Sequence, residues 1–332
     1  MCSTRCMSGS FSSHGRILTI GDVVAGRYEL TREIGRGGCA IVFEAIDDRL
    51  GRTVAVKVPV GFMGDAAKVS RFNRESRVIA SIHHPNVCAV LDSGEADDGT
   101  PFLVMERLYG ESLRTSVVKT GRLGINEAIS IGLQLLSALD AVHAAGIVHR
   151  DIKPDNLIMV SRGGCDPLLK LLDFGLCRRA SRERIDEETQ TRDGAIIGTP
   201  EYMAPEQVLG SSTLDVHVDL YAVGVVLYEA LTGTRAFYAK SVREILTCVM
   251  QKRVSPLRQL RRDAPPRLEA VLARAMQRRP EDRYPSAASF QEDLCDVRSE
   301  IGATGRKTWA TSWDAPTTKY EKPIRRAAGR TG

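Results

Sequence analysis

A short polar segment near the middle of the chain holds the side chains best suited to do chemistry. Asp151 is followed by Lys153 and Asn156, and Asp173 comes 22 positions after Asp151. A carboxylate, an ammonium and an amide this close together make poor core material, because each needs water, a polar partner, a metal ion or a phosphate. Their types fit one carboxylate that meets a hydroxyl and two oxygen ligands that hold Mg²⁺ against a polyphosphate. A charged surface turn would not explain both groups in this order.

A glycine-rich turn lies upstream of this segment. Gly35, Gly37 and Gly38 precede a strand predicted over residues 41–45, and Lys57 lies on the next predicted strand. Because glycine has no side chain, the backbone of such a turn can lie close to phosphate oxygens, and a lysine can reach the α- and β-phosphates. A dinucleotide-binding loop uses a similar glycine string but continues into a helix. The pattern therefore predicts a polyphosphate site formed by strands.

Hydrophobic periodicity predicts the helices that position these groups. Residues 66–82 and 125–145 have apolar residues at helical spacing, and Gly146 ends the second helix. Residues 218–232 are apolar nearly all round, which is typical of a helix buried at the centre of a large lobe. Asp219 lies early in that helix and must therefore find buried hydrogen-bond donors.

The body of the chain carries no net charge. The sequence of 332 residues has a formal net charge of +5, and residues 301–332 alone hold seven Lys or Arg against two Asp or Glu. Residues 1–300 are therefore neutral in sum, which argues against nucleic-acid binding through bulk charge. With 43% hydrophobic and 26% charged residues, the composition predicts an ordinary globular protein of one large domain or two lobes.

The cysteines and the two ends of the chain indicate a soluble, cytoplasmic protein. The eight cysteines show no metal-ligand spacing and are expected to be reduced thiols. No run approaches the ~20 apolar residues that cross a bilayer, so no membrane span is predicted. Residues 1–26 are expected to form a polar leader without the apolar stretch of a signal peptide, and residues 301–332 a basic, disordered tail.

Together these motifs resemble bacterial members of the eukaryotic-type (Hanks-type) Ser/Thr protein kinase family. Ala40 departs from the third position of the family's glycine pattern, a change of one methyl group. Eight signals occur in the family's order: the glycine loop, Lys57 in Val-Ala-Val-Lys, Glu75, His-Arg-Asp at 149–151, Asp-Phe-Gly at 173–175, Gly-Thr-Pro-Glu-Tyr at 198–202, Ala-Pro-Glu at 204–206, and Asp219 with Arg283.

The resemblance implies an α+β, bilobal protein-kinase fold. A small N-lobe, built from a five-stranded antiparallel sheet and one helix, is expected over residues 27–106. A larger and mostly helical C-lobe is expected from about residue 109 to residue 300, with ATP bound between the lobes.

Four polar residues receive catalytic roles from the resemblance. Asn156 and Asp173 would hold Mg²⁺ on the phosphates of ATP. Asp151 would orient and deprotonate the acceptor hydroxyl, and Lys153 would neutralise charge on the γ-phosphoryl group. Lys153, together with Thr199, favours serine and threonine over tyrosine as acceptors by the same resemblance.

Residues of both lobes would contact the nucleotide. Lys57, paired with Glu75 on the helix over 66–82, would fix the α- and β-phosphates; an exposed helix glutamate is the alternative for Glu75. Met105 would lie behind the adenine, and the backbone of Glu106 and Leu108 would bond its edge. Three apolar residues, which could equally be plain core, would sandwich the ring: Val42, Ala55 and Ile158.

Two long-range contacts are also implied. Asp219 would accept hydrogen bonds from the backbone of residues 149–150, and Arg283 would pair with Glu206. Both would connect the catalytic segment to the helices of the C-lobe.

The expected function is transfer of the γ-phosphoryl group of ATP to Ser/Thr hydroxyls of proteins, in signal transduction. A catalytically dead scaffold would be expected to lack one of Lys57, Asp151 or Asp173, and all three are present. A small-molecule phosphotransferase would not need the peptide-positioning segments at 198–200 and 204–206. Protein substrates and ATP are the expected partners, with no nucleic acid, and a homodimer would permit autophosphorylation in trans.

Activation is expected to depend on the polar run from Arg178 to Asp193. Thr189 and Thr191 lie in this run and resemble the paired-threonine site of bacterial receptor-type kinases. A phosphothreonine could take a bidentate contact from Arg150 and order the segment. Autophosphorylation is therefore predicted at both threonines.

Two further residue pairs leave alternatives open. Cys39 and Cys177 flank the predicted ATP cleft and are either redox-sensitive thiols or unreactive small residues. Trp309 and Trp313 lie beside the positive charge of the tail, which is either disordered or a docking segment.

Overall fold

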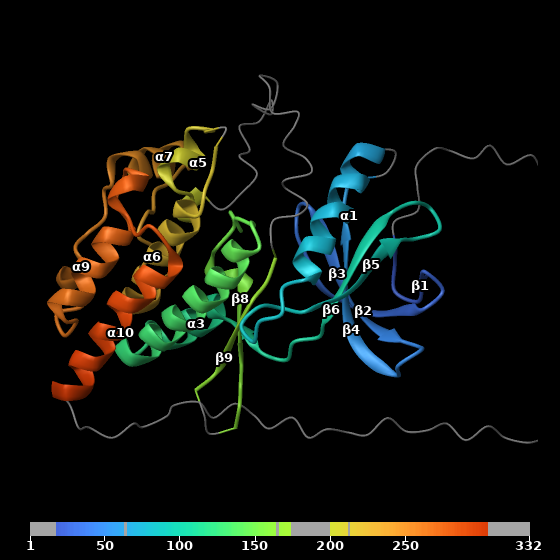
Figure 1. Cartoon of the computed structure of the whole chain (residues 1–332), viewed down its shortest axis with the longest axis horizontal. Coiled ribbons are helices and arrows are strands. Elements are labelled where there is room, and N and C mark those ends of the chain that lie inside the picture. Colours follow the sequence, from blue (N-terminus) through green and yellow to red (C-terminus); the bar gives the residue numbers. More distant parts are fainter. Residues whose placement is uncertain (1–17, 63–64, 164–165, 174–199, 212, 305–332) are drawn as a thin grey trace, which may run out of the picture.

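The computed structural model describes residues 18–62, 65–163, 166–173, 200–211 and 213–304. They form two lobes, a sheet with one helix and a larger, mostly helical body (Figure 1). The α+β, bilobal architecture expected from the sequence is confirmed.

The small lobe is built on one antiparallel sheet. Its strands lie in the order β1-β2-β3-β4-β6-β5. Six strands are present where five were expected, because β1 comes from the segment expected to be a polar leader; its Val24 is fully buried. The strands are β1 (Val23–Val24), β2 (Tyr28–Arg36), β3 (Ala40–Asp47), β4 (Arg52–Pro59), β5 (Val90–Glu95) and β6 (Pro101–Glu106).

Helix α1 (Ala66–Ala80) packs against β5 and β6 and confirms the helix predicted at this place. Phe72 and Ile79 form its buried face. Asp65 is the N-cap, and its side chain accepts a hydrogen bond from the Lys68 amide at 3.0 Å. Such a cap satisfies one of the amides that a helix start leaves without an intrahelical partner.

The large lobe is organised around two predicted helices, α3 (Ile125–Ala144) and α6 (His217–Thr232). Every residue of α6 from Val218 to Leu231 is buried, as its uniformly apolar sequence indicated. Around them lie α2 (Leu113–Thr120), α5 (Pro205–Val208), α7 (Val242–Gln251), α8 (Leu257–Leu260), α9 (Pro266–Ala275) and α10 (Ala287–Thr304).

Helix α3 is also long and apolar enough to cross a membrane by length and composition alone. More than half of its apolar window is buried in the protein, where it packs against α6 and α10. A core helix passes the same test, so this is weak evidence for a span.

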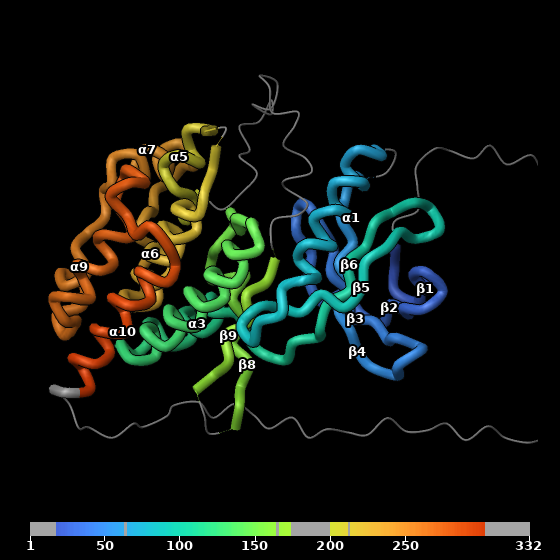
Figure 2. The backbone as a smooth tube through the Cα atoms, viewed as in Figure 1, coloured from blue at the N-terminus to red at the C-terminus, as the bar shows by residue number. Residues whose placement is uncertain are grey.

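A small second sheet brings the two polar motifs together. Strands β7 (Glu111–Ser112), β8 (Leu157–Val160) and β9 (Leu168–Leu171) pair in that order. Because β8 and β9 are antiparallel, Leu157 at the start of one lies opposite Leu171 at the end of the other. The residue before β8 and those after β9 are therefore neighbours, between the two lobes (Figure 2).

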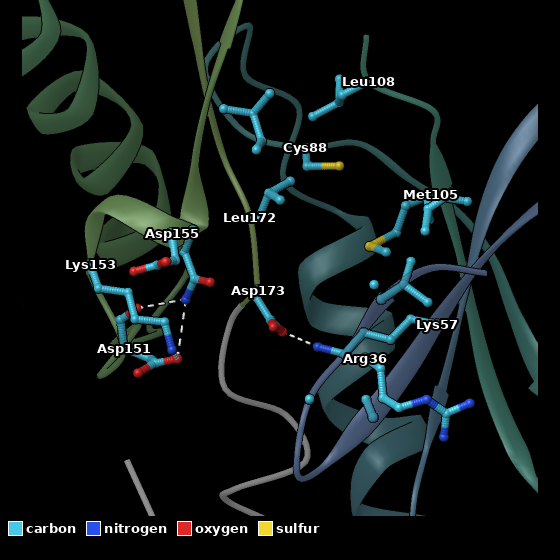
Figure 3. Close-up of a pocket in the computed structure, with 18 of the residues that line it drawn as sticks. Arg36, Lys57, Cys88, Met105, Leu108, Asp151, Lys153, Asp155, Leu172 and Asp173 are labelled. Atoms are coloured by element: carbon cyan, nitrogen blue, oxygen red, sulfur yellow. Dashed lines mark hydrogen bonds and ion pairs between the residues drawn. The ribbon is translucent and has the colours of Figure 1, made fainter. Parts of the chain in front are cut away.

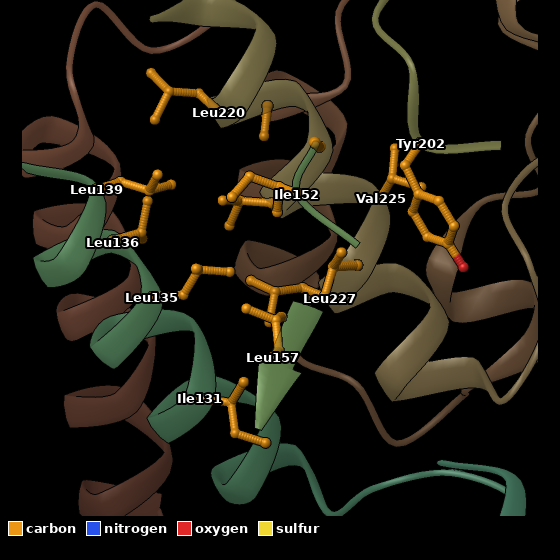
Figure 4. Close-up of a cluster of buried hydrophobic side chains, with 14 of the residues drawn as sticks. Ile131, Leu135, Leu136, Leu139, Ile152, Leu157, Tyr202, Leu220, Val225 and Leu227 are labelled. Carbon is orange, nitrogen blue, oxygen red and sulfur yellow. The ribbon is translucent and has the colours of Figure 1, made fainter. Parts of the chain in front are cut away.

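The segment between α3 and β8 is held by apolar side chains as well as by its polar groups. Ile152 and Leu157 are buried and point into the core beside residues of α3 and α6 such as Leu136 and Leu227 (Figure 4). Each of these apolar residues directly follows a polar one, Ile152 after Asp151 and Leu157 after Asn156, so their packing fixes the backbone that carries both polar residues.

Candidate active site

A cavity of about 910 Å³ lies between the lobes. Of the predicted site residues, Glu75 alone does not line it. The lining includes glycines of the β2–β3 turn (Gly35, Gly37, Gly38), residues from β3, β4 and the segment after β6 (Val42, Ala55, Lys57, Met105, Glu106, Leu108), and residues of the large lobe (Asp151, Lys153, Asn156, Ile158, Asp173).

Asp151 is held in place by its neighbours along the chain. The Lys153 ammonium lies 2.9 Å from its Oδ2, and the Asn156 side-chain amide donates to its carbonyl at 2.8 Å and to Oδ2 at 3.1 Å (Figure 3). The Asp151 and Lys153 side chains are 13% and 15% exposed, so both ends of the ion pair are largely shielded but open to the cavity. A carboxylate so placed can orient a hydroxyl and accept its proton.

His149 connects Asp151 to the strand that leads to Asp173. It is completely buried, and its Nε2 donates to the Leu172 carbonyl at 2.8 Å while its Nδ1 accepts the Asp151 amide at 3.3 Å. Burial lowers the pKa of His149, in agreement with a neutral ring that donates from one nitrogen and accepts at the other. One imidazole thereby sets the relative position of the two motifs.

Asp219 accepts hydrogen bonds from the backbone of residues 149–150, as predicted. Its carboxylate accepts the amides of His149 and Arg150 at 2.8 and 2.7 Å. A third donor, the Nε2 of His143 at 2.9 Å, was missed, because nothing in the sequence marks the end of α3 as facing α6. Burial favours the neutral acid, but the hydrogen bonds from His143 and from the Arg150 amide hold the pKa of Asp219 below its usual range.

Lys57 reaches across the cavity to Asp173, and this ion pair joins the two lobes (Figure 3). The side chains are 7% and 39% exposed. Asp173 has φ +62°, a left-handed conformation rare for non-glycine residues, which brings its carboxylate to the ammonium. Although burial works against the charged form, Lys57 holds the pKa of the Asp173 carboxyl below its usual range.

The Lys57 ammonium lies at Asp173, whose carboxylate is delivered from the large lobe by the backbone after β9. Glu75 is half-buried on α1. Its expected pairing with Lys57 stays a prediction.

Asn156 and Asp173 fit the donor set of a magnesium site. The Asn156 side-chain nitrogen donates hydrogen bonds to Asp151, so the side-chain oxygen of Asn156 is the atom left to bind a cation. The Leu172 amide donates to the Asn156 carbonyl at 2.8 Å, which places the two candidate ligands side by side. No cluster of three or more His, Cys, Asp or Glu suited to a metal occurs in the described part of the chain. Mg²⁺ is commonly held by one or two protein oxygens together with substrate phosphates.

The segment after β6 offers backbone groups to a nucleobase. The Glu106 amide donates to the Ala89 carbonyl at 3.0 Å, and the Glu106 carbonyl, 4.0 Å from the Cys88 sulfur, is the candidate acceptor for an adenine amino group. Its side chain turns away to Lys170, 2.6 Å distant. Cys88, which was not predicted, also lines the cavity.

Sequence reasoning also missed two arginines at the end of the cavity nearest Asp151. Arg114 on α2 and Arg235 after α6 both line it, and each is paired with a carboxylate far away in sequence, Glu229 and Glu201 respectively. No motif marks either arginine, and only the packing of α2 and of the segment after α6 brings them to the cavity.

Arg283 pairs with Glu206 as predicted. Its NH1 and NH2 nitrogens lie 2.6 and 2.8 Å from the two carboxylate oxygens. Other residues of the predicted motifs lie outside the described part of the chain: Phe174, Gly175, Cys177, Thr189, Thr191, Gly198, Thr199, Trp309 and Trp313.

Comparison with known proteins places this arrangement in a family. The protein kinase domain family matches residues 28–297. The chain is 37% identical over 284 residues to the serine/threonine-protein kinase pkn3 of Myxococcus xanthus, covering 85% of this chain and 52% of that protein. It is 37% identical over 285 residues to PknA of Mycobacterium tuberculosis, covering 84% and 63%. The chain thus spans between half and two thirds of the length of these relatives.

Solved structures agree. The PknI kinase domain of Mycobacterium tuberculosis, as a C20A_R136A double mutant, superposes with a TM-score of 0.67 and 25% identity, over 85% of this chain and 99% of that one. Rad53 1-466 in complex with AMP-PNP gives a TM-score of 0.66 and 25% identity, over 80% and 64%. The chain belongs to the protein kinase family and, within it, to the bacterial eukaryotic-type Ser/Thr kinases.

Proposed function

We propose that this chain transfers the γ-phosphoryl group of ATP to Ser/Thr hydroxyls of proteins. One observation carries the proposal: a single cavity between the lobes collects an ammonium (Lys57), a shielded carboxylate (Asp151) and two oxygen ligands (Asn156 and Asp173). Phosphoryl transfer needs positioning and electrostatic stabilisation more than covalent chemistry by the protein, and these groups supply both.

In the proposed reaction Asp151 accepts a hydrogen bond from the acceptor hydroxyl and takes its proton as the oxygen bonds to the γ-phosphorus. The bond between the γ-phosphorus and the β,γ-bridging oxygen breaks at the same time, and ADP leaves. Lys153, 2.9 Å from Asp151, stabilises the negative charge that develops on the transferred group. Asn156 and Asp173 would hold Mg²⁺, which when bound neutralises phosphate charge. Lys57 would bind the α- and β-phosphates, and Glu75 is its candidate partner when Asp173 engages the metal.

The adenine is proposed to lie between Val42 and Ala55 on one side and Ile158 on the other, with Met105 behind it. The carbonyl of Glu106 and the amide of Leu108 would bond its polar edge. All of these residues line the cavity, which supports the assignment.

Regulation through Thr189 and Thr191 stays a proposal. Its support comes from Arg150, which has φ +67° and a buried Nε without an acceptor among the described residues. The hydrogen bond from the Nη2 of Arg150 to the Leu214 carbonyl is long, at 3.4 Å. A phosphothreonine offers the oxygens that such a group needs.

The proposed partners are protein substrates, with a homodimer for autophosphorylation in trans and no nucleic acid. A cytoplasmic location is proposed because the described cysteines Cys39, Cys88, Cys248 and Cys295 are thiols without disulfides.

Labelled ATP with Mg²⁺ tests the proposal on the purified chain, with phosphosites mapped by mass spectrometry and Asp151→Asn as the control. We expect label on serine and threonine of the chain and of an added protein, and none with the variant. Label on small molecules alone would favour a small-molecule phosphotransferase, and no transfer at all would favour a scaffold. A Thr189→Ala/Thr191→Ala variant with full activity and no lag would contradict regulation by these threonines.

A further inference from the structure

A recess beside the catalytic loop is lined by Asp155 and Arg114. Asp155 lies in the short 3-10 helix Pro154–Asn156, next to Lys153, and lines the cavity together with Asp151 (Figure 3). Arg114, in the first turn of α2, lines the same cavity, and α2 packs against this 3-10 helix. Under the proposed function an acceptor hydroxyl must reach Asp151, and this brings the neighbouring side chains of the acceptor protein close to the recess.

The Arg114 guanidinium is bound by three groups from three parts of the chain. Its Nη1 donates a hydrogen bond to Oε1 of Glu229 on α6. Its Nη2 donates to the Tyr202 hydroxyl and lies 3.3 Å from Oδ2 of Asp155. The Tyr202 hydroxyl donates in turn to the other Glu229 oxygen at 2.5 Å. The Arg114 carbon CZ also lies 5.6 Å from the centre of the Tyr202 ring. The same set of groups would bind any guanidinium.

The groups that surround the Arg114 guanidinium require a cation between them. The Glu229 side chain is only 5% exposed, and a buried carboxylate without a cation is strongly destabilising. Burial and the Glu229 charge raise the pKa of Tyr202, so its hydroxyl stays a donor. The Arg114 side chain is 19% exposed and the Asp155 side chain 50%, so the recess is open to the cavity on the Asp155 side.

We infer that Arg114 occupies a guanidinium subsite of the acceptor-binding region. While Arg114 is in place, an arginine in the substrate adds little to kcat/KM. Once Arg114 is removed, an arginine of the substrate can bind in the same subsite. The inference rests on the proposed protein kinase function. Residue 114 thereby determines specificity, although Arg114 itself takes no part in phosphoryl transfer.

The neighbouring Arg235 does not fill a comparable recess. It is paired with one carboxylate, Glu201, at 2.8 Å, and its side chain is 42% exposed. Removal of Arg235 would leave one carboxylate, that of Glu201, and not a set of groups arranged around a guanidinium as at Arg114.

The first test compares Arg114→Ala with the wild type on peptides in which one arginine is moved through each position around the acceptor. For the wild type we expect kcat/KM to change less than about threefold between arginine and alanine at any position. For Arg114→Ala we expect arginine at one position to raise kcat/KM by roughly tenfold or more, as for a hydrogen bond between charged groups. Arg114→Ala/Glu229→Gln should lose this preference.

Arg267→Ala is the matched control. Arg267 also pairs with carboxylates, those of Asp293, Asp296 and Glu300, but on the surface between α9 and α10, away from the cavity. Its removal should create no arginine preference. A wild type that already selects arginine by tenfold, with the preference lost in Glu229→Gln, would overturn the inference, as would an Arg114→Ala enzyme without any preference.

A second test needs no catalysis. Ethylguanidinium matches the atoms removed in Arg114→Ala, so at millimolar concentration it should raise the Tm of this variant but not that of the wild type, of Arg267→Ala or of Arg114→Ala/Glu229→Gln. Should Arg114→Ala fold poorly, ethylguanidinium in the refolding buffer should restore it. An equal effect on all four proteins, or no rescue, would overturn the subsite. Absence of phosphorylation in every protein would instead contradict the proposed function.

Discussion

The Lys57 ammonium contacts the Asp173 carboxylate across the cavity, although 116 positions separate the two residues in sequence. Each side chain comes from a different lobe, Lys57 from β4 and Asp173 from the segment that follows β9. The ion pair thus places the Lys57 ammonium, which is proposed to bind phosphates, in direct contact with the Asp173 carboxylate, which is a proposed metal ligand.

Lys57→Met and Asp173→Asn are each expected to lower the rate of phosphoryl transfer by at least about a hundredfold, because each removes a charge that stabilises the transition state. The fold should persist, since the two groups lie at a cavity rather than in the core. Autophosphorylation with labelled ATP measures the rate and circular dichroism the fold. Activity near that of the wild type in either variant would contradict the assigned roles.

The Arg283–Glu206 pair is expected to be essential to stability. The Arg283 side chain is fully buried and that of Glu206 is 16% exposed, so either one without the other leaves a shielded charge. Arg283→Ala should lower the free energy of unfolding by about 3–5 kcal/mol. Arg279→Ala is the control, because its pair with Glu281 is exposed and should contribute less than about 1 kcal/mol. Urea titration of the two variants compares them directly.

His149 is expected to make the protein less stable in mild acid. Burial lowers its pKa from the ordinary value of 6.5, so below that pH the unfolded chain takes up a proton that the folded chain refuses. The free energy of unfolding should therefore fall as the pH drops through 6.5, by up to about 1.4 kcal/mol per pH unit from this group. His149→Gln keeps a donor and an acceptor but does not titrate. Its stability should depend less on pH between 7.5 and 5.5, and equal slopes would contradict the prediction.

The two cysteines that line the cavity in the described part of the chain are expected to react differently. Burial and the nearby Glu106 carboxylate raise the pKa of Cys88 to about 12, so at pH 8 it is a thiol and should resist iodoacetamide. Cys39 is half-buried at the glycine turn and lines the cavity, so it should be alkylated and ATP should protect it. Peptide mapping measures both, with Cys248 as a half-buried thiol that does not line the cavity. Modification of Cys39 at the same rate with and without ATP would contradict its placement.

Much of this protein could be predicted from local sequence. The helices α3 and α6 follow from their apolar spacing, and the lining of the cavity follows from motifs in which a few residue types recur at fixed intervals. The pairing of Asp219 with the backbone of residues 149–150 was also predictable, because a buried carboxylate requires donors and the family resemblance indicated which ones.

Other contacts between charged groups were decided by the tertiary structure alone. Lys57 lies at Asp173, His143 joins Asp219, and Arg114 lies at Glu229, 115 positions away. These contacts depend on the relative orientation of two lobes and of helices such as α2 and α6. That orientation results from packing over the whole core, whereas hydrophobic spacing in the sequence records only which face of each element is buried.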